Sequence, residues 1–342
     1  MQVNNYNPRR SWGKKEIGWL VLLLTTLTIV CFFSLTFDIT APWQTLLAVI
    51  RNYDDTVKEQ VILISRISRV IVALFAGASL ALSGLLMQLH YHNTLADPSL
   101  MGITDGSALV VVSMLAFFPE STIMMRIVAS VAGSLGAYGL IQLGLKQVRA
   151  QRSPVALPLV GLILSMILGS LTTLIASYFA LSQSMTSWYS SRLYRVEWQH
   201  VRYFILPLLL VLIVAVVLRR QFAVYRYDHD LAIAIGMERR VFESVLQAIV
   251  IVLTGVSVAI VGRIAFVGLI VPHIARLMFG NRYEKLVMIV PFLGAVLVVT
   301  ADYTGRFLNY PFETPIGIMF ALIGVPIFLW LIKTGKGQGY DV

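Results

Sequence analysis

The chain has 342 residues, of which 58% are hydrophobic and 13% are charged, and its mean hydropathy is +0.80. A soluble domain cannot bury that much apolar surface, so these values exclude an ordinary soluble protein and indicate a polytopic membrane protein. The single cysteine, Cys31, excludes an intrachain disulfide and a thiolate metal cluster. The net charge of +10 comes from basic residues at the ends of apolar runs, which favours membrane orientation over nucleic-acid binding.

The apolar runs extend from residue 17 to residue 332, so we expect one all-α transmembrane domain over 1–342 with short tails at 1–16 and 333–342. The first run follows basic residues as in a signal peptide, but it has span length and no small-residue cleavage site follows it. We therefore interpret it as a retained span. We predict about ten spans: 17–37, 61–89, 98–118, 124–145, 155–181, 203–218, 241–261, 264–279, 286–307 and 315–332. Both termini then lie on the cytoplasmic side, together with most of the basic residues.

Two spans carry small residues at every fourth position, a spacing that produces a flat ridge on one face of a helix. Such ridges let helices pack closely in lipid, and we interpret these two as packing surfaces. The ridges are Ala73, Gly77 and Ala81 in the second span, and Ala129, Gly133 and Ala137 in the fourth.

The fifth span has a more polar stripe at the same spacing, formed by Ser165, Gly169, Thr173 and Ser177. The four residues share one helical face. Their hydroxyls can bond to carbonyls one turn back in a packed interface, or they can line a water-filled path. The pattern leaves both interpretations open.

Ion coupling usually needs an ionisable group near the bilayer centre, and we expect none here. Asp105 and Glu243 are predicted near inner ends of spans, and Asp302 towards an outer end. The chain also contains no phosphate-binding G-x-x-x-x-G-K-[ST] loop. Uphill transport would therefore draw on ATP hydrolysed by a separate chain.

A cytoplasmic surface for such a partner is predicted between the sixth and seventh spans. Asp230 precedes the short apolar run Leu231–Ile235, and Gly236 follows it, which indicates a capped helix too short to cross a membrane. It can lie in a groove of a partner or on the lipid interface, and the pattern alone does not separate the two.

The segment Gly262–Arg276 is apolar but short, and two glycines and a proline interrupt it before it ends at a basic residue. A helix that only anchors a protein in the membrane would be an uninterrupted apolar run. A discontinuous segment among other spans points to a transport pathway.

Several strings together resemble the permease subunits of iron–siderophore and cobalamin ABC importers. The resemblance covers nearly the whole chain. It is strongest over 65–106, which includes Ser65–Arg69, Gly77–Gly84 and Asn93–Pro98, and over 262–331, which includes Gly262–Arg276 and Pro315–Leu331.

The resemblance implies a ten-span permease in a bacterial cell membrane that pairs with a second copy or a close homologue. Two ATPase subunits would bind on the cytoplasmic side, and a substrate-binding protein would dock outside. Iron would pass as a chelate, so the permease would need no metal ligands or cofactor of its own, and it would not itself be an enzyme.

The resemblance also assigns roles to individual positions. The basic residues that receive the binding protein would be Arg66, Arg69 and Arg306, and the cytoplasmic gate would include Asn93 and Leu95. Arg306 is also expected to form an i,i+4 pair with Asp302, which can hold alongside docking. Thr94 and His92 depart from the proline and the basic residue that are common in the family. Leu231–Met237 matches the coupling helix, which favours the groove. The positions that would contact the ATPase are Leu231, Ala232, Ala234, Gly236, Met237, His273 and Arg276.

Other functions remain as alternatives. Haem or cobalamin would be carried by the same kind of permease, whereas an ion-coupled secondary transporter would need the missing central carboxylate. An intramembrane aspartyl protease would need a second membrane aspartate beside Asp105. The five histidines form no H-x-x-x-H pattern, so we interpret them as ordinary loop histidines, with His90 and His92 in one loop.

Overall fold

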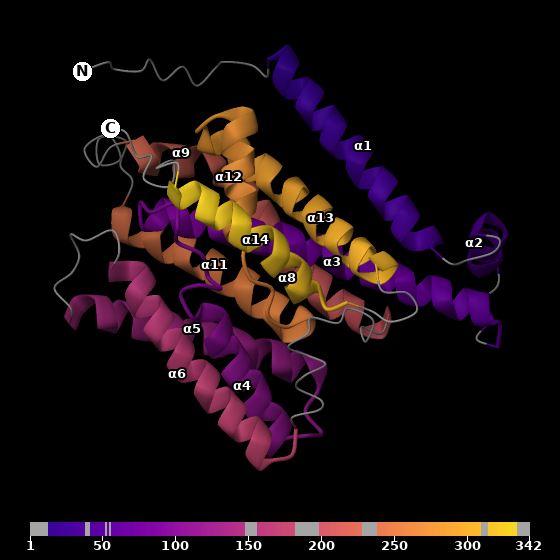
Figure 1. The fold of residues 1–342 in the computed structure, drawn as a ribbon, viewed down its shortest axis with the longest axis horizontal. Helices are drawn as coiled ribbons and strands as arrows, with labels where there is room; N and C mark the ends of the chain where they lie inside the picture. Colours follow the sequence, from indigo (N-terminus) through magenta and orange to yellow (C-terminus); the bar gives the residue numbers. More distant parts are fainter. Residues whose placement is uncertain are drawn as a thin grey trace.

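The computed structural model of the protein describes residues 13–37, 42–51, 53–54, 56–147, 156–181, 198–227, 238–308 and 314–333. The regular structure of these segments is entirely α-helical (Figure 1). The helices are α1 (Lys14–Thr36), α2 (Pro42–Arg51), α3 (Lys58–His90), α4 (Ile103–Phe117), α5 (Ile123–Gln147), α6 (Ala156–Tyr178), α8 (Trp198–Val217), α9 (Arg219–Tyr227), α11 (Arg239–Val261), α12 (Val267–Phe279), α13 (Tyr283–Leu308) and α14 (Ile316–Lys333).

Six of the described helices are long and apolar enough to cross a membrane: α1, α3, α5, α6, α11 and α13. A seventh candidate is the pair α8 and α9, which bends by 55° at its break. Three other apolar helices, α4, α12 and the first part of α14, are shorter than a membrane span normally requires. Helix length and composition therefore confirm a polytopic membrane protein but do not confirm the predicted count of about ten spans.

Helix α3 lies at the centre of the bundle and packs most extensively against α13, α11 and α12 (Figure 1). A second group, formed by α4, α5 and α6, joins this centre through α11. Helix α1 runs along α13 at the edge, with few of its residues buried. A helix that is apolar on all sides and packed on only one side is suited to contact lipid.

Glycines stand where helices of the bundle touch. Any side chain at Gly77 of α3 would collide with the backbone of Gly294 in α13, and Gly84 and Gly268 form a similar contact between α3 and α12. Gly133 of α5 packs in the same way on Gly106 of α4. The structure confirms the packing interpretation of the two small-residue ridges, because close approach of backbones replaces the missing hydrophobic drive in lipid.

Replacing Gly77 by valine is therefore expected to destabilise the fold by more than about 3 kcal/mol, because the new side chain meets backbone that cannot move aside. Gly136 of α5 offers a matched control, since a side chain there has no neighbour within 4 Å. Thermal unfolding of the purified protein in detergent measures the difference. Equal melting temperatures for the two valine variants would contradict the close contact.

The discontinuous segment predicted around Gly262–Arg276 is a break between α11 and α12. Helix α11 ends at Val261, and Gly262 and Phe266 both have positive φ, at 78° and 69°. Helix α12 then has only 13 residues, about 20 Å against a hydrocarbon core of about 30 Å. Of the three residues predicted to interrupt the segment, Gly262 lies at the break, whereas Gly268 and Pro272 lie within α12. Arg263 is consequently held outside regular helix.

Candidate functional site

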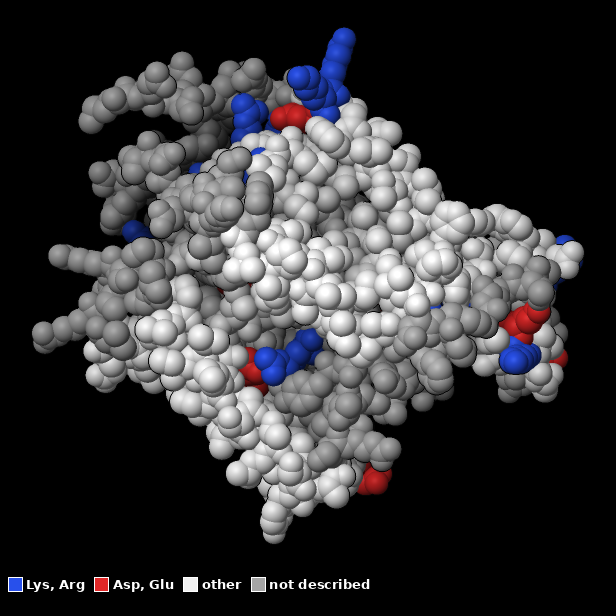
Figure 2. Space-filling model, viewed as in Figure 1, with Lys and Arg blue, Asp and Glu red and all other residues white. Residues whose placement is uncertain are grey.

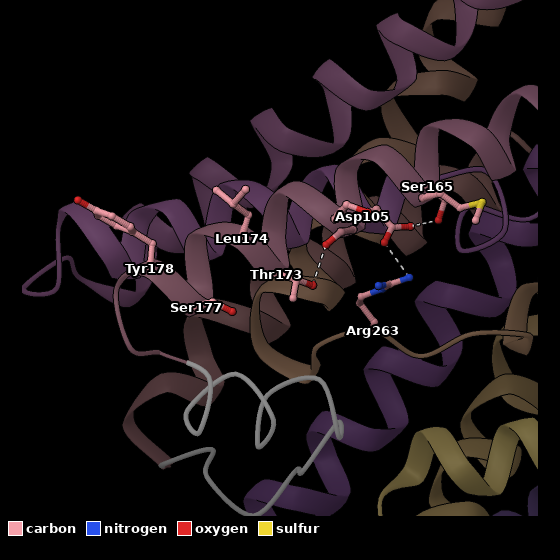
Figure 3. A pocket seen from close by; sticks show the side chains of 10 residues that line it. Asp105, Ser165, Thr173, Leu174, Ser177, Tyr178 and Arg263 are labelled. Carbon is pink, nitrogen blue, oxygen red and sulfur yellow. Dashed lines mark hydrogen bonds and ion pairs between the residues drawn. The ribbon is translucent and has the colours of Figure 1, made fainter.

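An open pocket of about 1210 Å³ lies along one face of α6. All four residues of the predicted polar stripe line it (Figure 3). Ten described residues line the pocket: Asp105, Ser165, Met166, Gly169, Ser170, Thr173, Leu174, Ser177, Tyr178 and Arg263. The stripe therefore faces open space rather than a packed helix, which favours the water-lined alternative.

Asp105 and Arg263 form an ion pair at one end of this pocket. Nη2 of Arg263 lies 2.7 Å from Oδ1 of Asp105, and the hydroxyl of Ser165 donates a hydrogen bond to Oδ2 of the same carboxylate (Figure 3). The carboxylate side chain is only 1% exposed, whereas the arginine side chain is 33% exposed. On the face drawn in Figure 2, the charged side chains gather mainly at the edges, except for a group of both signs in a hollow.

The loop before α4 places Asp105 deep in the bundle. Residues 98–102 form turns, and α4 begins only at Ile103. Gly102 (φ 82°) packs on the backbone of Ser165, which is the tenth residue of the 23-residue α6. Asp105 thus lies beside the middle of α6. Asp105 is in the first turn of α4, which fits the prediction that it lies near the end of a span, but this helix begins at Ile103 and not at 98 as expected.

At one end of the bundle, Asp302 of α13 joins two of the three arginines expected to receive the binding protein. Nη2 of Arg69 lies 2.7 Å from its carboxylate, and Nη2 of Arg306 lies 3.3 Å from it. Arg306 also donates to the carbonyl and the hydroxyl of Ser34 in α1. These contacts tie α1, α3 and α13 together. The predicted i,i+4 pair of Asp302 and Arg306 is confirmed.

The third arginine, Arg66, is half-buried, and its guanidinium lies over the ring of Phe37 with a carbon-to-centroid distance of 5.9 Å. Arg306 faces the same ring at 6.0 Å. The three arginines and Asp302 therefore form one cluster, here called the arginine cluster. Arg69 and Arg306 are at most 8% exposed, so the half-buried Arg66 is the most exposed arginine of the cluster, although its Nη1 is buried.

The loop that carries the predicted gate is shaped by its own side chains. Oδ1 of Asn93 accepts a hydrogen bond from the backbone N–H of Leu95 at 2.9 Å. Asp97 is buried and accepts the N–H of Ser99 at 2.8 Å. Both contacts are typical of Asx turns. Partial burial lowers the pKa of His92, so the imidazole is neutral near pH 7 and the loop has no positive charge at this position.

The opposite end of α3 contacts the residues expected near the ATPase. Nη2 of Arg276 donates to Oε1 of Gln88 at 2.5 Å, and Nε2 of Gln88 donates to the carbonyl of Gly268 at 3.1 Å. His273 is half-buried one turn earlier on α12. The predicted coupling residues Leu231, Ala232, Ala234, Gly236 and Met237 lie outside the described residues.

His90 is the last residue of α3, not a loop residue as predicted, and its Nε2 lies 3.2 Å from both Oη of Tyr138 and Nε2 of Gln247. Within the described segments, His, Cys, Asp and Glu side chains form no group of three that could hold a metal ion.

A bundle of long apolar helices with a broken span defines a multi-pass membrane protein, and an open polar pocket along one helix is a feature expected of a transport pathway. Comparisons with known proteins agree. The FecCD transport family matches residues 22–334, nearly the full length. The chain therefore belongs to the FecCD transport family, and the resemblance recognised in the sequence is confirmed.

Among its relatives, the iron-uptake system permease protein FeuB of Bacillus subtilis is 38% identical over 82% of this chain and 84% of that protein. The iron(3+)-hydroxamate import system permease protein FhuB of the same organism is 35% identical over 94% of this chain and 85% of its own. A solved structure, described as an inward-facing conformation of a metal-chelate type ABC transporter, superposes with a TM-score of 0.75 at 27% identity, covering 93% of this chain and 99% of that one. The all-α ABC importer permease fold is thereby established.

Proposed function

We propose that this chain is the transmembrane subunit of an ATP-driven importer that takes up ferric siderophore complexes across a bacterial cytoplasmic membrane. The observation that carries the proposal is family membership over residues 22–334, together with relatives named for iron uptake and for iron(3+)-hydroxamate import. The chain would work with a second permease subunit, two ATPase subunits and an extracytoplasmic substrate-binding protein.

Ten spans with both termini in the cytoplasm form part of this proposal. The six long helices, the bent pair and the three shorter apolar helices correspond one for one to the ten predicted segments. The shorter helices are acceptable because irregular backbone at membrane depth is tolerated where it is buried in protein or lines a cavity. In this topology the arginine cluster faces outside, and Arg276 faces the cytoplasm.

The pocket along α6 would be one half of the substrate path. Its hydroxyl-bearing face is open in the single chain, and a second permease packed across it would close the path. The gate residues Asn93 and Leu95 would narrow the cytoplasmic mouth. His273, Arg276 and the segment 231–237 would receive the ATPase, because they lie at the cytoplasmic side in the proposed topology.

Reconstitution tests the proposed function. Proteoliposomes that contain the permease, its ATPase and its binding protein should accumulate a ferric siderophore only with ATP inside. The permease alone should accumulate none. Concentrative uptake by the lone permease, or uptake driven by a proton gradient without ATP, would refute the proposal and favour a secondary transporter.

Cysteine accessibility tests the proposed path. In a Cys31→Ser background, Thr173→Cys is expected to react with a charged, membrane-impermeant thiol reagent at least about tenfold faster than Leu171→Cys, because only a hydrated thiol ionises readily. Leu171 is an exposed residue of the same helix outside the pocket lining, so it reports the lipid-facing side. A bound ferric siderophore should slow the reaction at 173. Equal rates at the two positions would place the stripe away from the path.

A further inference from the structure

The pair formed by Asp105 and Arg263 is unusual for a membrane interior, where charges are expensive and normally serve a function. A pair that only held helices together would gain from burying both partners with all their hydrogen bonds made. Here the carboxylate is 1% exposed, but one third of the arginine side chain remains open to the pocket. Arg263 therefore pairs with Asp105 while part of its side chain borders the open pocket.

Arg263 is the one cationic residue among the described residues that line the pocket. Among the described residues that line the pocket, Asp105 and Arg263 are the charged ones, and the others are small, hydroxyl-bearing or apolar. A guanidinium has five N–H donors in a rigid fork that fits the oxygen pairs of carboxylate-like anions. Asp105 holds one side of the fork, so an anionic ligand in the pocket would compete with this carboxylate for the guanidinium.

We propose that Arg263 recognises the anionic iron-chelating oxygens of the transported complex, and that Asp105 is the internal carboxylate that holds the guanidinium when no substrate is present. This inference rests on the proposed function and adds a substrate class: ferric chelates with net negative charge. Along the same wall, the hydroxyl of Ser177 can donate a neutral hydrogen bond, whereas those of Ser165 and Thr173 already donate to Asp105 and to the carbonyl of Gly169.

The position of Arg263 in the chain supports this role. It lies in the break between α11 and α12, fixed by the positive φ angles of Gly262 and Phe266. The Phe266 ring lies so close to Gly324 of α14 that a side chain at 324 would clash with it. The loop is thus anchored on both sides of the arginine, which limits the freedom that binding would otherwise have to remove.

Substrate charge provides the test. Iron(III) held by three catecholates is triply negative, whereas iron(III) held by three hydroxamates is neutral. In proteoliposomes with ATPase and binding protein, uptake of the two chelates is compared at saturating binding protein. We expect Arg263→Gln to lower the ratio of anionic to neutral uptake at least about tenfold, and Arg263→Lys to lower it less, because lysine keeps the charge but loses the fork. Asp105→Asn should maintain or raise the ratio, because it removes the competing carboxylate.

The charge-swapped double variant, Asp105→Arg with Arg263→Asp, separates recognition from structure. If the pair only joins α4 to the break, exchanging the charges restores uptake of both chelates. On our proposal the swap leaves anionic uptake low, since the guanidinium then projects from α4. ATP hydrolysis by each assembled complex reports whether the complex is folded. If the Arg263→Gln complex does not assemble, the uptake ratio of the Arg263→Lys complex tests the proposal instead.

The outcomes are distinct. A wild-type complex that moves neither chelate contradicts the proposed function. A wild-type complex that moves only the neutral chelate, an unchanged ratio in Arg263→Gln and Arg263→Lys, or full rescue by the swap overturns the role of Arg263 while leaving the importer itself intact.

Discussion

Asp302→Asn is expected to destabilise the protein by about 3–5 kcal/mol, because it leaves two buried guanidinium groups without their shared counter-charge. Asparagine keeps the size of the side chain, so packing is little changed and the effect reports the charge. The same change also loosens α1, which is joined to the cluster through Arg306 and Ser34. Such a loss is large against the total stability of a typical domain.

Thermal unfolding in detergent measures this effect, with Asp54→Asn as the control. Asp54 is an exposed aspartate that precedes α3, and its carboxylate accepts hydrogen bonds from the backbone N–H and the hydroxyl of Thr56. We expect its variant to unfold close to the wild-type temperature. A melting temperature for Asp302→Asn equal to that of the control would mean that Asp302 does not neutralise the two arginines.

Removing all three charges together refines the interpretation. The triple variant Asp302→Leu, Arg69→Met and Arg306→Met exchanges a buried ion cluster for apolar side chains, which is often neutral or stabilising. We expect it to be more stable than Asp302→Asn. If it folds and still imports, Arg69 and Arg306 serve the fold and not the binding protein.

Local patterns in the sequence predicted much of this architecture. Helical periodicity predicted the glycine ridge at Gly77 and the polar stripe through Ser165 and Thr173. The backbone freedom of glycine predicted the break after Val261. Each is a property of one helix or one turn, so the residues that determine it lie within a short window.

Pairings between distant residues were harder to predict. Asp302 was expected to pair with Arg306, four residues away, but its closer contact with Arg69 joins positions 233 residues apart. Asp105 and Arg263 were not connected at all. One signal was available: isolated charges in apolar segments must find partners, and an arginine and an aspartate within two such segments were candidates for each other. Helix periodicity gave no distance between them.

The start of the helix that carries Asp105 was misplaced for a different reason. The apolar composition of 98–118 suggested one continuous helix, whereas residues 98–102 form turns fixed by the buried Asp97. A loop enclosed by neighbouring helices can be as apolar as a helix, so composition does not reveal where the helix begins. The consequence is functional, because the same loop places the carboxylate beside the pocket.

Arg66→Glu is expected to reduce the affinity of the binding protein for the transporter more than tenfold at low salt. An exposed ion pair contributes only about 0–1 kcal/mol, but reversing the charge also sets like charges against each other, which costs several kcal/mol. Arg66 is a better position than Arg69 for this charge reversal, because a glutamate at 69 would lie beside the buried Asp302 and disturb the fold. Insertion and melting temperature should stay near the wild-type values.

Affinity is measured with purified binding protein and transporter at several salt concentrations, and Arg202→Glu serves as the control. Arg202 is an exposed arginine near the start of α8, on the same side in the proposed topology, and it contacts its neighbour Tyr203. The wild-type affinity should fall with salt, whereas the residual affinity of Arg66→Glu should fall less, because docking then no longer gains from that charge. If Arg66→Glu and Arg202→Glu weaken docking equally, the general charge of this surface attracts the binding protein, and the arginine cluster has no specific part in docking.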